Sequence, residues 1–203
     1  MKYQIFLDLQ KKYLISGESM RIITGKLRGR KLKSPKTYDV RPTSDKVKEA
    51  VFDMLQPYMI DDFVCMDVFA GSGNLGLEAI SRGAKTVYFS DNSRESLSLV
   101  RENVKICEAE NNAVLLAGDF KSNISRVHEK VDIFFVDPPY ADKMALAAIN
   151  AIDSANNLKD GGVIVCEHSA KDVLPDEYLD YKAVKQRRYG AIGVTIYSKI
   201  RNN

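Results

Sequence analysis

The feature that most constrains the fold is a regular alternation of short apolar runs and helical segments that begins at Phe63. The β-branched and aromatic runs predict five strands, at residues 63–69, 86–90, 113–117, 131–136 and 162–167. Segments with a helical pattern lie between them, at residues 75–82, 94–106 and 144–155. Strands that alternate with helices form a parallel sheet with both faces covered, so we expect an α/β fold.

The last part of the chain departs from this alternation. Two extended runs, residues 182–189 and 192–200, are joined at Gly190-Ala191 without an intervening helix. Such a pair predicts a terminal antiparallel hairpin. We therefore expect a mostly parallel, seven-stranded sheet that ends in a C-terminal antiparallel hairpin.

Three regions are predicted along the chain. Residues 1–19 fit no element of the pattern and are expected to be an extension outside the fold. Residues 20–40 are predicted to form a small basic β-hairpin, and residues 41–203 the main domain. The main domain is expected to open with a helix that begins at the N-cap Ser44 and ends at Pro57.

The composition excludes several classes of protein. Hydrophobic residues make up 45% of the chain and charged residues 28%, as in globular proteins. No apolar run has the ~20 residues that a membrane-spanning helix needs. The three cysteines are odd in number and widely spaced, which indicates neither a disulfide framework nor a metal site. We expect a cytoplasmic protein without a bound metal.

Charge is unevenly distributed, although the net charge is only +3. Residues 21–48 carry ten basic and two acidic side chains, whereas residues 49–179 carry 11 basic and 22 acidic ones. The end of the chain is basic again. An acidic body with two basic ends favours a nucleic-acid partner, although solvated charge runs are also common on protein surfaces.

The sequence Asp137-Pro138-Pro139-Tyr140 directly follows the apolar run 131–136. Two prolines stiffen the turn and offer carbonyl groups without competing N–H donors. An aspartate, these carbonyls and an aromatic ring are suited to hold a planar amino group and to stack on the ring that carries it. A plain turn that ends a strand is the alternative, because Asp and Pro are ordinary turn residues.

A glycine-rich loop lies between the first predicted strand and the helix that follows it. Gly71, Gly73 and Gly76 have the Gly-x-Gly-x-x-Gly spacing, which lets backbone N–H groups approach a bound ligand. Asp91 ends the second strand, where a carboxylate can bind ribose hydroxyls. Asp119 and Phe120 follow the third strand, where an adenine would lie. Each acidic residue alone is an ordinary strand end, but together they predict an adenosine site.

In these motifs the chain resembles the class I S-adenosylmethionine-dependent methyltransferases, which have a Rossmann-like fold and, with Asp-Pro-Pro-Tyr, methylate exocyclic amines. With the segment 20–32, Arg41-Pro42-Thr43 and residues 67–78 added, it resembles the RsmD family from Met20 to Lys199. That resemblance implies methyl transfer to the N2 amine of a guanine in small-subunit (16S) ribosomal RNA of bacteria. Family members often have Phe where this chain has Tyr140, and either ring can stack.

The resemblance also implies roles for particular residues. Asp137, Pro138 and Tyr140 are expected to be catalytic, and no metal ligands are expected. Cofactor-binding residues are expected to be Arg41, Pro42, Thr43, Phe69, Ala70, Gly71, Ser72, Gly73, Asn74, Gly76, Asp91, Asn92, Asp119, Phe120 and Asp137. RNA-binding residues are expected to be Arg21, Lys26, Arg28, Arg30, Lys31, Arg188 and Tyr189.

Several other functions remain open at this point. An N6-adenine methyltransferase on DNA or RNA would use the same four residues from Asp137 to Tyr140. A glutamine methyltransferase of proteins usually has Asn at the first of these positions. A dinucleotide-dependent oxidoreductase and a non-catalytic ribosome assembly factor that binds S-adenosylmethionine are further alternatives. For a chain of this size with one main domain we expect a monomer.

Overall fold

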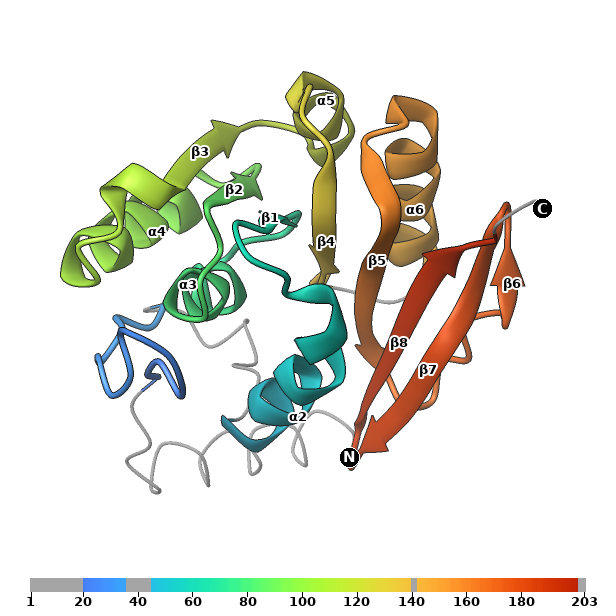
Figure 1. Ribbon diagram of the computed structural model, residues 1–203, viewed down its shortest axis with the longest axis horizontal. Helices are drawn as coiled ribbons and strands as arrows, with labels where there is room; N and C mark the ends of the chain where they lie inside the picture. Colours follow the sequence, from blue (N-terminus) through green and yellow to red (C-terminus); the bar gives the residue numbers. More distant parts are fainter. Residues whose placement is uncertain (1–19, 36–44, 140–141, 201–203) are drawn as a thin grey trace, which may run out of the picture.

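The computed structural model describes residues 20–35, 45–139 and 142–200 of the chain (Figure 1). Its described strands form one sheet in the order β3-β2-β1-β4-β5-β8-β7-β6. Five strands are parallel: β1 (Val64–Asp67), β2 (Thr86–Asp91), β3 (Ala113–Ala117), β4 (Val131–Val136) and β5 (Leu158–Ser169). The other three pair antiparallel: β6 (Glu177–Tyr178), β7 (Tyr181–Tyr189) and β8 (Ile192–Lys199). The predicted α/β fold, parallel sheet and terminal hairpin are confirmed.

The sheet has eight described strands where the sequence predicted seven. The additional strand, β6, has two residues and pairs only with the start of β7. A strand of this length is too short to show a periodic pattern. The strand β5 also begins earlier than predicted, because residues 159–162 form an irregularity within it instead of a preceding turn.

Helices cover both faces of the sheet (Figure 1). The described helices are α2 (Asp45–Leu55), η1 (Gln56–Tyr58), α3 (Asn74–Ser81), α4 (Arg94–Ile106), η2 (Glu110–Asn112), α5 (Phe120–Arg126) and α6 (Asp142–Ala155). Side chains of α2, α3 and α4 share one buried cluster with one face of the strands, and side chains of α5 and α6 share the other. The short helix α5 was not predicted. Its N-cap is Asp119, whose carboxylate accepts hydrogen bonds from the N–H groups of Lys121 and Ser122.

The segment 20–35, called the basic segment below, packs against the main domain. Its two arms meet at an isolated bridge between Arg21 and Lys31, without a regular strand in either arm, and residues 36–40 of the predicted hairpin lie outside the described residues. Met20, Ile22 and Leu32 are buried in the cluster formed with α2, α3 and α4. Gly25 lies so close to α3 that an added Cβ would be 1.9 Å from the Ser81 carbonyl oxygen. The basic segment is thus held against the body of the protein by backbone packing.

Other predictions from composition can be compared with the described residues. Cys65, Cys107 and Cys166 are buried free thiols, as expected for small core residues. In the described ranges, no helix combines the length and the apolar character that a membrane span requires. The described part of the chain also holds no group of three or more side chains suited to a metal ion.

Candidate active site

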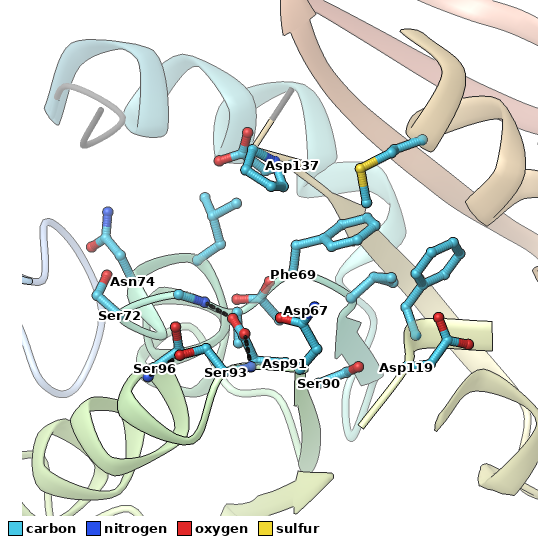
Figure 2. A pocket seen from close by; sticks show the side chains of 18 of the residues that line it. Asp67, Phe69, Ser72, Asn74, Ser90, Asp91, Ser93, Ser96, Asp119 and Asp137 are labelled. Atoms are coloured by element: carbon cyan, nitrogen blue, oxygen red, sulfur yellow. Dashed lines mark hydrogen bonds between the residues drawn. The ribbon is translucent and has the colours of Figure 1, made fainter. Parts of the chain in front are cut away.

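A cavity of about 350 Å³ lies at the carboxyl edge of β1, β2, β3 and β4 (Figure 2). β1 and β4 are neighbours, and the chain order changes direction between them. In open α/β sheets ligands bind in the crevice at this switch point. The described residues that line the cavity are Met20, Asp67, Val68, Phe69, Ala70, Gly71, Ser72, Asn74, Leu75, Ser90, Asp91, Asn92, Ser93, Ser96, Gly118, Asp119, Phe120, Asp137, Pro139 and Met144.

The glycine loop turns sharply between β1 and α3. Gly73 is the N-cap of α3 and has a left-handed backbone, with φ of 79°. Its N–H donates to the Ala70 carbonyl at 2.6 Å, which closes the turn. Such a conformation is easily adopted only by glycine. The loop therefore brings Ala70, Gly71 and Ser72 to the wall of the cavity.

Gly76 differs in its surroundings from Gly71 and Gly73, the other two glycines of the motif. It does not line the cavity, and an added Cβ there would lie 2.3 Å from the Phe89 ring. The glycine thus lets α3 approach β2 closely. Gly73 and Pro138, which were expected to contact ligands, are also not among the lining residues.

The Asp91 carboxylate is fixed at the end of β2. Its Oδ2 atom accepts a hydrogen bond from the Gly71 N–H at 2.9 Å, and Oδ1 accepts one from the Ser93 N–H at 2.8 Å. Figure 2 shows both bonds at the floor of the cavity. A carboxylate oxygen has two lone pairs, so each atom can accept one further hydroxyl group. The side chain is therefore oriented to receive a pair of neighbouring hydroxyls.

Two aromatic rings form another part of the wall. The centroids of the Phe69 and Phe120 rings are 5.1 Å apart, with the planes inclined by 52°. Asp119 lies beside Phe120 and also lines the cavity. Apolar rings next to a carboxylate acceptor suit a flat heterocycle that carries an amino group.

Asp67 was not predicted as a site residue, although it lines the cavity at the end of β1. Its side chain is buried, and Oδ2 accepts a hydrogen bond from the Gly76 N–H at 3.2 Å. Burial raises the pKa of Asp67 to about 7, the Gly76 hydrogen bond opposes this rise, and the negative charge of Asp91 adds to it. The sequence signal was its position directly before the glycine loop.

Asp137 follows β4 and lines the cavity from the side opposite Asp91 (Figure 2). The pKa of Asp137 is raised well above its ordinary value, first by burial and then by the charges of Glu167 and Asp67. A carboxyl group with a raised pKa is a stronger proton acceptor once ionised. The geometry thus places the Asp91 and Asp137 carboxyl groups on opposite sides of the cavity.

The expected cofactor-binding and catalytic residues fall into three groups, of which Gly73, Gly76 and Pro138 form the group that is described but does not line the cavity. Those brought together along the cavity are Phe69, Ala70, Gly71, Ser72, Asn74, Asp91, Asn92, Asp119, Phe120 and Asp137. Arg41, Pro42, Thr43 and Tyr140 lie outside the described residues. Lining residues that were not expected to bind the cofactor include Met20, Ser90, Ser93, Ser96, Pro139 and Met144. Met20 and Pro139 lie in segments that the sequence analysis quoted, whereas the three serines and Met144 belong to no motif.

The basic residues expected to bind RNA differ in their surroundings. Arg21 forms an ion pair with Asp45 at 2.9 Å, and Arg30 forms one with Glu108 at 2.9 Å. Lys26, Arg28 and Lys31 are exposed. On the terminal hairpin, Arg188 is exposed and Tyr189 is half-buried against the core.

Comparison with known proteins gives consistent matches over most of the chain. A family model described as "Conserved hypothetical protein 95" matches residues 20–198, a range that includes every residue lining the cavity. The Bacillus subtilis (strain 168) protein YlbH, named provisionally as an rRNA methyltransferase, is 37% identical over 183 residues, which cover 89% of this chain and 99% of YlbH.

Two Escherichia coli proteins are similar as well. Ribosomal RNA small subunit methyltransferase D of strain K12 is 32% identical over 180 residues, covering 89% of this chain and 90% of that protein. The solved structure of yhhF, described provisionally as a methyltransferase, superimposes with a TM-score of 0.79 at 31% identity. That match covers 90% of this chain and 98% of yhhF.

Proposed function

The chain belongs to the family described as conserved hypothetical protein 95, together with the ribosomal RNA small subunit methyltransferases D, and from this premise we propose its reaction. The protein transfers a methyl group from S-adenosylmethionine to the exocyclic N2 amine of a guanine in small-subunit ribosomal RNA. The observation that carries this proposal is a single cavity that joins the glycine loop and Asp91 to Asp137. Family membership and fold support methyl transfer to ribosomal RNA, and the guanine N2 atom is our extension.

The residues of the cavity fit S-adenosylmethionine. A volume of about 350 Å³ is within the range of ligand pockets. The two Asp91 oxygens suit the ribose hydroxyls, because each already accepts one backbone N–H and retains a second lone pair. Phe69, Phe120 and Asp119 suit the adenine ring and its amino group. The glycine loop would then lie along the rest of the cofactor.

The chemistry depends on how the chain holds the target amine. The bound cofactor supplies a methyl group on a sulfonium centre, so that a nitrogen–carbon bond forms as the carbon–sulfur bond breaks. Asp137 accepts a hydrogen bond from the amine and orients its lone pair toward the cavity. The raised pKa of Asp137 also suits it to accept the proton that the nitrogen loses. Much of the rate gain in such a transfer comes from positioning.

The basic segment and the terminal hairpin would bind the RNA backbone. Lys26, Arg28 and Lys31 are exposed on the basic segment, and Arg187 and Arg188 are exposed on β7. Exposed Lys and Arg side chains bind phosphates without reading sequence. We propose that these residues position the RNA, while the loop after β4 holds the base.

The experiment that tests the proposed reaction compares the wild-type protein with Asp137→Ala and Asp137→Asn. Radiolabelled S-adenosylmethionine is offered with unmodified small-subunit rRNA, free and in assembled subunits, and cofactor binding is measured by calorimetry. We expect the wild type to label the RNA and both variants to lose at least about 100-fold in rate while binding the cofactor. Equal transfer by Asp137→Ala would contradict the role of this residue. Cofactor binding without any transfer by the wild type would favour a non-catalytic assembly factor.

A further inference from the structure

Glu167 lies beside Asp137 at the carboxyl edge of the sheet. The last paired residues of β4 and β5 are Val136 and Cys166, and Asp137 and Glu167 are the next residues of the two chains. Residues in register on neighbouring parallel strands point to the same face of the sheet. The structure thus brings two carboxyl groups together where the predicted amine-binding loop begins.

The surroundings of the two groups support this placement. Asp137 and Glu167 border the same small cleft, whose other walls include Val51, Leu75 and Val194. Both residues are half-buried. The pKa of Asp137 is raised first by burial and second by the negative charge of Glu167, as expected of two carboxyl groups on one cleft.

The order of the strands places Glu167 on the far side of Asp137 from the cofactor cavity. The cavity is lined from β1, β2, β3 and the loop after β4, and Glu167 is not among its lining residues. β5 is the next strand beyond β4. Consider a base that presents its amine to Asp137 from outside the cavity. The ring atom next to that amine would then lie beside the end of β5, where Glu167 stands.

Guanine and adenine differ at the ring atom next to the amine. Guanine has two neighbouring donors, the N2 amine and the N1–H, whereas adenine has the N6 amine beside N1, an acceptor. Two neighbouring carboxylates therefore match guanine, and an unprotonated carboxylate opposes adenine N1. We propose that Glu167 accepts the N1–H of the target guanine while Asp137 accepts an N2–H, so that Glu167 selects guanine over adenine. This inference rests on the proposed function.

The test uses 2-aminopurine, which keeps the 2-amino group of guanine but has an acceptor at N1. RNA substrates carry either guanine or 2-aminopurine at the position that the wild type methylates, and kcat/KM is measured for both. We expect the wild type to prefer guanine by about 10- to 100-fold, because a site built for an N–H rejects an analogue without it. In Glu167→Gln the preference should fall to about one or reverse, since an amide can donate to N1 of 2-aminopurine.

A matched control is available on the same strand. Asp160 is an exposed acidic residue near the opposite end of β5, and Asp160→Asn should keep the wild-type preference. A merely structural role for Glu167 would lower kcat/KM for both bases equally and leave their ratio unchanged. An unchanged ratio in Glu167→Gln, or a wild-type ratio of about one, would overturn the inference and leave the proposed function standing. No guanine methylation by the wild type would instead overturn the proposed function, and the inference with it.

Discussion

Lys48 and Glu78 form an ion pair in which both side chains are fully buried, with Nζ 3.2 Å from Oε2. The Lys48 ammonium group also donates to the Arg21 carbonyl at 2.7 Å and to Asn74 Oδ1 at 2.6 Å. Glu78 accepts hydrogen bonds from the backbone N–H groups of Ile23 and Thr24 at 2.8 and 3.0 Å. The pair therefore joins the basic segment to α2 and α3.

Replacing Lys48 should destabilise the protein strongly. Lys48→Met leaves the buried Glu78 carboxylate without its ammonium partner, although Arg82 still lies 3.0 Å from Oε1. We expect a loss of about 3 kcal/mol in the free energy of unfolding, measured with urea. Lys46→Met on the same helix is the control, because Lys46 is exposed and should change stability by less than about 0.5 kcal/mol. Equal effects of the two variants would contradict the structural role of the pair.

Asp67 should make the stability of the cofactor-free protein depend on pH. Burial raises its pKa in the folded state to about 7 from 3.8. Between these values the folded state binds more protons than the unfolded state, so this contribution to stability is present below pH 3.8 and is lost as pH rises through 7. The variant Asp67→Asn has no carboxyl group at this position and should not show this fall in stability with rising pH.

The Asp67 prediction is measured as a difference between two stability curves. From pH 4 to pH 8, the free energy of unfolding of Asp67→Asn should rise relative to that of the wild type, by at most about 4 kcal/mol. Chemical unfolding at a series of pH values gives both curves. Parallel curves over this range would show that the carboxyl group does not titrate as the structure indicates.

A methyl group added at Gly76 should clash with the Phe89 ring and, less severely, with Val87. In Gly76→Ala the new Cβ would lie 2.3 Å from the Phe89 ring, so α3 or the ring has to move. We expect a destabilisation of about 1–3 kcal/mol, as for other overpacked cores. In the Phe89→Leu background the same substitution should cost less, and a double-mutant cycle measures this coupling. Additive effects would mean that the two positions do not compete for space.

Neutralising the exposed cations of the basic segment should weaken RNA binding and its dependence on salt. The test is a triple variant that combines Lys26→Gln, Arg28→Gln and Lys31→Gln. The slope of log RNA affinity against log salt concentration should become shallower by about one unit for each phosphate that is no longer bound. Lys85→Gln is the control, because Lys85 is exposed just before β2, at the opposite edge of the sheet from the cavity. The same slope in the triple variant and the wild type would exclude these side chains from RNA binding.

The sequence predicted the elements whose side chains repeat with a clear period. Arg94–Ile106, Ala113–Ala117 and Val131–Val136 were predicted with the bounds that the structure gives. Helix α5 was missed because it has only seven residues and its N-cap, Asp119, was interpreted only as a ligand-binding residue. The burial of Lys48 could not be predicted, since its partners lie far away in sequence and a lysine on a helix is normally solvated.

The site was predictable where a motif follows a strand. The glycine loop, Asp91, Asp119 and Asp137 were expected at strand ends. In the structure the three aspartates and residues of the glycine loop line one cavity. Glu167 has no motif, and its relation to Asp137 follows only from the register of β4 with β5. Sequence alone therefore left guanine and adenine as alternatives, because Glu167, which we propose to select between them, lies on another strand.

The central claim is that the cavity and Asp137 serve methyl transfer to guanine N2 in ribosomal RNA. The most direct test digests the labelled RNA product to nucleosides and identifies the methylated one by chromatography and mass spectrometry. We predict N2-methylguanosine as the labelled nucleoside, formed by the wild type and lost in Asp137→Ala. Label in N6-methyladenosine, or in ribosomal protein instead of RNA, would contradict the account.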